Sequence, residues 1–375
     1  MYKNINYFES LNGLRFFAAF LVVIHHSESI RLSYNMFNLK QFSLFNNGGL
    51  AVSFFFVLSG FLITYLLLKE KSITNQISIK KFYLRRILRI WPLYYLLVFI
   101  GTIVLPAILT YISSDVKIPY SFFDVILYYI FFTPFMVNIF YGHHFLDPLW
   151  SIGVEEVFYL IWAPLIKLFK SRSLIVITLI VVLKITIMVL MFLFFKNTVL
   201  YQVLRYLKFE SMAIGALGAY VVFNSKKEIS SFLIFGKPAQ IVIFTFVILR
   251  LTTFKYFLLY GGLMSFFFNT PFLSSFILDF IFLWMVLNLS LNKNHIFNFN
   301  NSILNFLGNI SYGIYMYHML VIFLVVLLFS NFLNTISDIY STLLFYFITT
   351  ILLLIVSYMS KILFEDKFLK LKKHV

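Results

Sequence analysis

The first apolar stretch of the sequence has an arginine at one end and two histidines at the other: Arg15 and His25-His26 flank the run FFAAFLVVI. Ionisable side chains inside a membrane segment are costly and often functional. In an α-helix the eleven positions from Arg15 to His26 make three turns plus about 20°, so both side chains share one face, about 16 Å apart along the axis. His25 lies about 80° away. Of the two histidines, helical geometry therefore selects His26 as the partner of Arg15, the alternative being an imidazole that reaches the membrane interface.

A basic cluster opens the segment FYLRRILRIWPLYYL, where Arg85, Arg86 and Arg89 precede an apolar run. Arg86 and Arg89 are three positions apart and are neighbours on one helical face. Guanidinium groups bind phosphates through paired hydrogen bonds. A phosphate site is thus one interpretation of the cluster. Arginines at the end of a membrane helix more commonly contact lipid headgroups, so the cluster alone does not decide between the two.

Two adjacent carboxylates, Glu155 and Glu156, lie near the outer end of their apolar segment in LWSIGVEEVFYLIW. They point about 100° apart on a helix, so at most one needs to face a shared site. The membrane topology derived below places the two glutamates at about the same depth in the bilayer as His26. A carboxylate beside an imidazole fixes its tautomer and supports its charged form, so either glutamate is a candidate partner of His26.

A further histidine lies in the segment GNISYGIYMYHMLVI, where His318 follows Tyr312, Tyr315 and Tyr317. Two interpretations are open: the four residues line a polar cavity, or His318 is a buried histidine with its hydrogen bonds satisfied. We favour the cavity. We predict no metal site at the pair His143-His144, which lies in a short connection, and cysteine is absent.

Membrane helices must position these residues. The chain has 375 residues, of which 61% are hydrophobic and 12% are charged, about half the charged fraction of a soluble domain. Apolar runs of roughly 20 residues favour helices over barrel strands. We expect one integral-membrane domain over residues 1–375, its first run retained as a span. The net charge of +16 comes from residues between and after the apolar runs, which indicates membrane topology and anionic lipids rather than nucleic acid.

Charge counting gives the orientation. The connection 69–89 has seven basic residues and one acidic residue, so it should lie in the cytoplasm, as should the N-terminus two crossings earlier. The apolar segments are roughly 11–27, 48–68, 90–109, 122–140, 149–166, 173–195, 205–223, 233–251, 272–290, 303–329 and 340–362.

One of these segments conflicts with the charge count. The basic residues within 167–172 face the cytoplasm only if 122–140, which contains Asp124 and Pro134, does not cross fully. We therefore predict an all-α, polytopic transmembrane helix bundle of about ten crossing helices plus one re-entrant or non-crossing segment. Both termini are then cytoplasmic.

Five segments together resemble the acyltransferase family 3 of membrane-bound O-acyltransferases. They are NGLRFFAAFLVVIHH, GGLAVSFFFVLSGFLIT, FYLRRILRIWPLYYL, PLWSIGVEEVFYL and GNISYGIYMYHMLVI, in this order over nearly the whole chain. The family motif of a basic residue, ten residues and a histidine falls on Arg15 and His26. Its Arg-x-x-Arg motif falls on Arg86 and Arg89. The chain resembles the family members that lack an extra extracytoplasmic domain.

The resemblance implies a multi-pass enzyme of the bacterial inner or plasma membrane. It would transfer an acyl group, most often acetyl, from cytoplasmic acyl-CoA to a hydroxyl of a cell-surface glycan or lipid-linked sugar, with no permanently bound cofactor. His26 would act as general base, or as a nucleophile that forms an acyl-imidazole; we favour the base.

The resemblance also implies roles for the other candidates. Glu155 or Glu156 would orient the imidazole. The basic side chains of Arg15, Arg85, Arg86 and Arg89 would hold the acyl-CoA. The side chains of Ser151, Tyr315 and His318 would contact the acceptor.

Two other readings remain. A transporter or flippase would also place charged residues in the membrane and use a broken helix. Against it, the sequence shows no inverted repeat, and its basic cluster lies at one membrane face only. A catalytically inactive partner subunit is the second. The sequence does not specify the acceptor or the oligomeric state.

Overall fold

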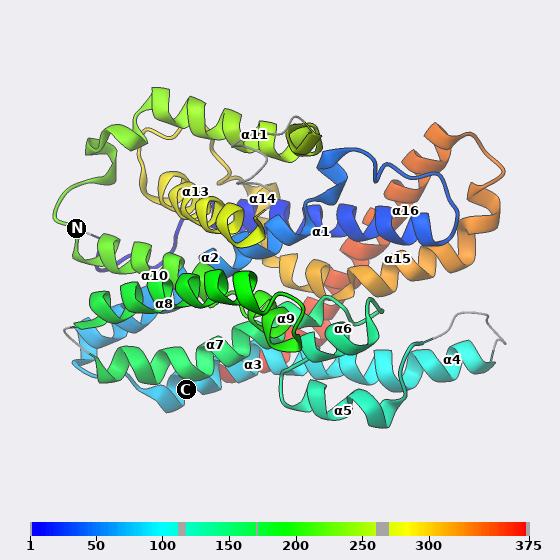
Figure 1. Cartoon of the computed structure of the whole chain (residues 1–375), viewed down its shortest axis with the longest axis horizontal. Helices are drawn as coiled ribbons and strands as arrows, with labels where there is room; N and C mark the ends of the chain where they lie inside the picture. Colours follow the sequence, from blue (N-terminus) through cyan, green and yellow to red (C-terminus); the bar gives the residue numbers. More distant parts are fainter. Residues whose placement is uncertain (1, 112–117, 170–171, 260–269, 373–375) are drawn as a thin grey trace.

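A computed structural model describes residues 2–111, 118–169, 172–259 and 270–372. These residues form helices and contain no β-strand, which confirms the predicted all-α class (Figure 1). The α-helices are α1 (Leu11–Ser33), α2 (Gly48–Thr74), α3 (Ile79–Phe99), α4 (Leu105–Tyr111), α5 (Phe122–Ile130), α6 (Phe135–Tyr141), α7 (Leu149–Leu168), α8 (Ser173–Phe194), α9 (Val199–Tyr206), α10 (Phe209–Asn224), α11 (Lys237–Leu259), α13 (Pro271–Leu291), α14 (Ser302–Asn309), α15 (Ser311–Leu333), α16 (Asp338–Ser360) and α17 (Asp366–Leu371). Short 3₁₀ or π-helical turns lie at Ser43–Asn46, Ile100–Val104, Ile229–Ser231, Leu233–Phe235 and Lys361–Glu365.

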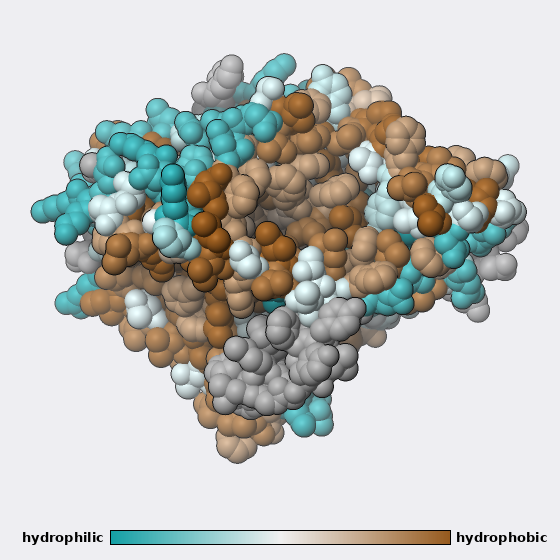
Figure 2. All heavy atoms as spheres, turned by 90° about the horizontal axis from the view of Figure 1, so that it is seen from above, coloured by the Kyte–Doolittle hydropathy of each residue, from teal (hydrophilic) through white to brown (hydrophobic). Residues whose placement is uncertain are grey.

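Within the part of the chain that the structure describes, eight helical stretches are long and apolar enough to cross a membrane. They are Gly48–Thr74, Ile79–Tyr111, Leu149–Leu168, Ser173–Phe194, Val199–Asn224, Phe272–Leu291, Ser311–Leu333 and Asp338–Leu371. Figure 2 shows apolar side chains across the middle of one face, with hydrophilic ones gathered mainly toward the two ends. The chain is therefore a polytopic helical membrane protein.

The two ends of the bundle differ in what they carry. The N- and C-termini lie at the same end of the molecule, where α2 ends and α3 begins (Figure 1). The connection between α15 and α16, and the C-terminal end of α1, lie at the opposite end (Figure 1). The Arg15–His26 helix therefore runs from the interior of the bundle toward the end without the termini.

The segment 122–140 is broken into two short helices. α5 has 9 residues and α6 has 7, whereas a membrane span needs roughly 20. Asp124 forms a capping box with Ser121 at the start of α5. Phe132 has a left-handed φ of 56°, and Pro134 then caps α6. This is the local structure expected of a segment that does not cross as one helix.

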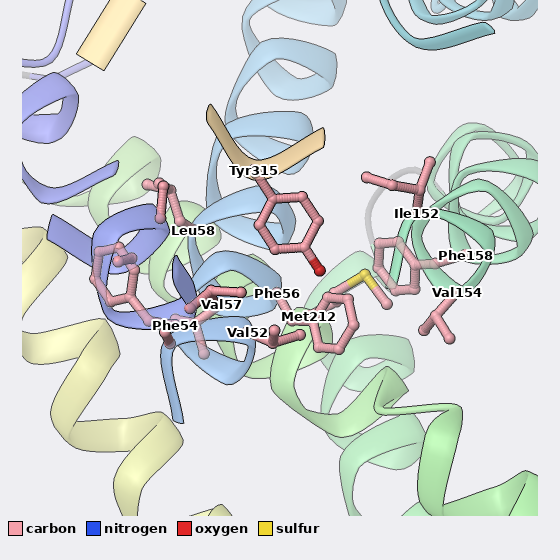
Figure 3. Close-up of a cluster of buried hydrophobic side chains, with 14 of the residues drawn as sticks. Val52, Phe54, Phe56, Val57, Leu58, Ile152, Val154, Phe158, Met212 and Tyr315 are labelled. Carbon is pink, nitrogen blue, oxygen red and sulfur yellow. The ribbon is translucent and has the colours of Figure 1, made fainter. Parts of the chain in front are cut away.

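α2 and α10 pack backbone to backbone, and two glycines make this approach possible. A Cβ at Gly60 of α2 would lie 1.9 Å from the Met212 carbonyl oxygen of α10. A Cβ at Gly215 of α10 would lie 1.9 Å from the Val57 carbonyl oxygen of α2. Small residues at such positions allow close helix packing in membranes. Figure 3 shows the surrounding cluster, in which side chains of α2, α7 and α10 meet the Tyr315 ring from α15.

Replacing Gly215 with alanine should unfold the protein or prevent its assembly, because the new Cβ would overlap the backbone of α2. Overpacking of a tight interior commonly costs about 1–3 kcal/mol and more where backbone must move. Thermal unfolding in detergent measures the effect. Gly49→Ala is the matched control, since a Cβ at Gly49 of α2 meets nothing within 4 Å. Equal stability of the two variants would contradict the role assigned to Gly215.

Candidate active site

A pocket lies between α1, α2, α3, α7 and α15 and encloses about 820 Å³ of empty space, its open mouth included. This size is typical of small-molecule sites. Apolar side chains of α2, including Val52 and Phe55, form part of its wall. Its ionisable and hydroxyl-bearing lining residues are Arg15, Ser59, Arg86, Arg89, Ser151, Glu155, Tyr159, Ser311, Tyr312 and Tyr315. An apolar site with convergent polar groups is suited to orienting a ligand.

Three arginines from two helices converge on this pocket. Arg15 of α1 is half-buried and donates a hydrogen bond to Asn12 Oδ1 at 3.2 Å. The Arg86 guanidinium of α3 lies 5.8 Å from the centroid of the Tyr159 ring, and Arg89, one turn later, is exposed. No ion pair within 4 Å neutralises these arginines among the described residues. The pocket therefore has an excess of positive charge that suits a phosphorylated ligand.

Glu155 faces the arginine pocket and is held by a tyrosine. The Tyr159 hydroxyl donates a hydrogen bond to Glu155 Oε2 at 2.5 Å and is also hydrogen bonded to Ser59 of α2. Glu155 and Tyr159 are four positions apart, so they lie on one face of α7. Tyr159 is not among the residues predicted from the sequence, although its four-residue spacing from Glu155 places both side chains on one helical face.

Of the predicted glutamate and arginine site residues, two do not line the pocket. Glu156 Oε2 accepts a hydrogen bond from Trp91 Nε1 at 2.9 Å. Arg85 forms an ion pair with Glu70 at 2.8 Å between Nη2 and Oε2. Neither Glu155 nor Glu156 is hydrogen bonded to an imidazole in the part of the chain that the structure describes. The glutamates that sequence counting placed at the depth of His26 thus have other partners.

Ser151 and Tyr315 meet at one end of the pocket. Their hydroxyl oxygens are 2.7 Å apart and hydrogen bonded, and Tyr315 also donates to the Pro148 carbonyl oxygen at 3.1 Å. Both side chains are buried. In Figure 3 the Tyr315 ring enters the cluster with its hydroxyl directed into the space between α2 and α7.

His26 and His318 lie together beyond Tyr315. The centroids of the His318 and Tyr315 rings are 5.7 Å apart, and those of His26 and His318 are 5.2 Å apart. Neither histidine is part of the pocket lining. The structure therefore brings Arg15, Arg86, Arg89, Glu155, Ser151 and Tyr315 to one pocket, with the two histidines next to its Tyr315 end.

Comparison with known proteins decides the family. Residues 8–361 match the acyltransferase 3 family, described as an acyltransferase domain. The chain belongs to this family. The motif resemblance noted in the sequence is thereby confirmed over nearly the whole chain.

Curated relatives match part of this acyltransferase 3 chain. The peptidoglycan O-acetyltransferase OatA of Listeria monocytogenes is 32% identical over 172 residues, which cover 44% of this chain and 25% of OatA. A putative O-acetyltransferase of Staphylococcus aureus is 33% identical over 166 residues, 42% of this chain and 24% of the relative. The putative peptidoglycan O-acetyltransferase YrhL of Bacillus subtilis is 30% identical over 174 residues, 44% and 25%. The matches span about a quarter of the length of these relatives, and no solved structure matches significantly.

This acyltransferase 3 chain has one further polar group near His26 that the sequence analysis missed. Asp147, in the connection before α7, is 4% exposed and accepts hydrogen bonds from Asn138 Nδ2 and from His143 Nδ1, the latter at 2.6 Å. Burial alone raises the pKa of Asp147, but the His143 hydrogen bond and the charge of His26 outweigh burial and lower it. An aspartate directly before Pro148 at the start of a helix was the signal that could have found it.

Removing His143 should change how the stability of this acyltransferase 3 protein depends on pH. The Asp147 hydrogen bond and charge raise the pKa of His143 above its ordinary value of 6.5. The folded state thus binds this proton more tightly, so the stabilisation is complete below about pH 6.5 and is lost as pH rises through the raised pKa. His143→Gln should cost about 1 kcal/mol or less, because the imidazole is 88% exposed. Thermal unfolding between about pH 5.5 and about pH 8.5 tests this. A stability difference between wild type and variant that did not shrink with rising pH would contradict it.

Proposed function

We propose that this protein is a membrane-bound O-acyltransferase that moves an acyl group, with acetyl the first to test, from cytoplasmic acyl-CoA to a hydroxyl of a cell-surface glycan or lipid-linked sugar. The observation that carries the proposal is the convergence of Arg15, Arg86 and Arg89 on one pocket in a chain of the acyltransferase 3 family. Acyl-CoA carries several phosphates, which guanidinium groups bind well. The names of the relatives support acetyl transfer to a glycan.

The proposal includes a membrane topology. α1 and α11 each have 23 residues, enough to cross, and with the eight apolar stretches they make ten crossings. The basic connection between α2 and α3, at the end that also holds both termini, lies in the cytoplasm. Bacterial inner or plasma membrane is the setting. Acyl-CoA then enters from the cytoplasmic end of α3 and reaches Arg86 and the exposed Arg89 further along this helix.

The donor lies along α1 in this proposal. Arg86 and Arg89 hold phosphates at the mouth, Arg15 contacts the donor further in, and Glu155 offsets part of the positive charge. His26 follows Arg15 by about 16 Å along the helix. The extended pantetheine arm bridges this distance and presents the thioester near His26. Ser151 and Tyr315, at that end of the pocket, contact the acceptor.

The chemical step requires a base. His26 takes the proton of the acceptor hydroxyl as its oxygen attacks the thioester carbonyl carbon. The carbon–sulfur bond breaks, and the CoA thiolate leaves and takes the proton from the imidazolium, which restores neutral His26. The products are the ester and CoA. An acyl-imidazole at His26 is the alternative route, in which the acyl group is transferred twice.

The test uses purified protein in nanodiscs with radiolabelled acetyl-CoA and, separately, with added glycan acceptors. We expect release of free CoA and, with a suitable acceptor, label in the glycan. Radiolabel that remains bound to the protein after the reaction is quenched with acid would favour the acyl-imidazole. Absence of donor binding for acetyl-CoA and for longer acyl-CoA would contradict the proposal. Movement of a substrate across the membrane without CoA release would favour a transporter instead.

A further inference from the structure

His318 of α15 lies directly beside His26 of α1, and its side chain has no exposed surface. The centroids of the two rings are 5.2 Å apart and their planes are inclined by 45°. The two helices pack against each other, so this pairing belongs to the bundle core rather than to a loop. A centroid distance of 5.2 Å allows a hydrogen bond between one nitrogen of each ring once the rings are rotated to bring these nitrogens together.

The hydrogen-bond partner of His318 fixes its tautomer. Its Nδ1 lies 2.5 Å from the Tyr315 carbonyl oxygen. A carbonyl oxygen can only accept, so Nδ1 carries the hydrogen, and in the neutral ring Nε2 carries a lone pair. This Nε2 is buried and has no hydrogen-bond partner among the described residues. A buried acceptor without a donor is unusual and calls for an explanation.

The other polar groups near His26 are less available as acceptors. The groups that interact with His26 electrostatically are His318, Asp147, His25 and His143. Both carboxylate oxygens of Asp147 already accept hydrogen bonds from other side chains. The His25 ring lies against Gly48 of α2, where an added Cβ would be 2.6 Å from its Cδ2. His318 Nε2 is therefore the best-placed acceptor for an N–H of His26.

We propose that His318 is a positioning residue for His26. Its Nε2 accepts a hydrogen bond from one ring nitrogen of His26, which leaves the lone pair of the other nitrogen free to take the proton of the acceptor hydroxyl. The Tyr315 carbonyl holds His318 in the required tautomer, and the Tyr315 hydroxyl joins the same helix turn to Ser151 in the pocket wall. An orienting partner of this kind fixes a catalytic imidazole in other enzymes, commonly as a carboxylate. The inference rests on the proposed function, in which His26 is the base.

A pair of variants separates positioning from packing. His318→Gln places an amide oxygen near the position of Nε2 and keeps an acceptor for His26. His318→Asn keeps a donor for the Tyr315 carbonyl but reaches no further. Positioning partners commonly contribute on the order of 10–100-fold. We expect this loss of kcat/KM for CoA release in His318→Asn, a changed pH profile of kcat/KM, and retention of activity within a few-fold in His318→Gln. Equal losses in both variants, or none in His318→Asn, would overturn the inference.

A second readout does not need activity. Nitrogen-15 NMR of histidine-labelled protein in nanodiscs reports the tautomer of His26, identified by difference from His26→Asn. We expect one tautomer in wild type and in His318→Gln, and a mixture in His318→Asn. An unchanged His26 tautomer in His318→Asn would overturn the inference whatever the activity. A changed His26 tautomer in His318→Asn, together with a wild-type protein that transfers no acyl group, would support the hydrogen bond and contradict the proposed function.

Discussion

Replacing His26 with alanine should abolish measurable acyl transfer while the helix bundle stays folded. A general base contributes on the order of 10²–10⁴-fold to a rate, and alanine is the best helix former at an interior helical position. His26 lies well inside α1, which ends at Ser33. The measurement is the rate of CoA release from radiolabelled acetyl-CoA, beside thermal unfolding of the same preparation. Near-normal turnover in a folded variant would refute the mechanism.

His25→Ala is the matched control for that experiment. The two histidines are adjacent on α1, but the His25 ring packs against Gly48 of α2, whereas the His26 ring faces His318. His25→Ala should lose packing and some stability but keep most of its turnover. An inactive His25→Ala together with an active His26→Ala would mean that the base is His25 and not His26.

Much of the fold follows from hydropathy, because a bilayer sets both the length and the apolar character of each helix. The break between α9 and α10 is different. Hydropathy predicts one span over 205–223, but Leu207 and Lys208 leave helical geometry there. The sequence has no proline or glycine at this break that would predict it. Lys208 Nζ instead donates a hydrogen bond to Ser53 Oγ of α2 at 2.7 Å. A contact between distant segments overrides local helix propensity, and a single sequence does not contain it.

The candidate site, like the fold, can be predicted from the sequence only in part. The alignment of Arg15 with His26 is a property of one helix, so helical geometry predicts it. The partner of Glu155 depends on how α7 is rotated against its neighbours. Counting crossings gives the depth of a residue but not the direction of its side chain. Glu155 consequently faces the arginine pocket, and the buried group with an unpaired nitrogen beside His26 comes from α15.

Replacing Arg86 with alanine should raise the KM for acetyl-CoA by about 10- to 100-fold and change kcat little. Hydrogen bonds to charged groups contribute about 1.5–3 kcal/mol, and about 1.4 kcal/mol corresponds to tenfold in affinity. The Arg86 Nε has no hydrogen-bond partner among the described residues, so this side chain has free capacity for a ligand. Steady-state kinetics of CoA release give KM and kcat separately. Arg86→Lys should recover only part of the affinity, since lysine keeps the charge and loses the paired geometry.

Arg85→Ala is the control one position away. Arg85 has the same charge, but its guanidinium pairs with Glu70 at 2.8 Å outside the pocket. Its removal should change the KM for acetyl-CoA far less than removal of Arg86. The donor itself offers a second control, because acetyl-pantetheine has no phosphate. Arg86→Ala and wild type should use acetyl-pantetheine equally well if Arg86 binds phosphate. A loss of the same size with both donors would instead mean that Arg86 acts on the structure of the pocket, through its contact with the Tyr159 ring.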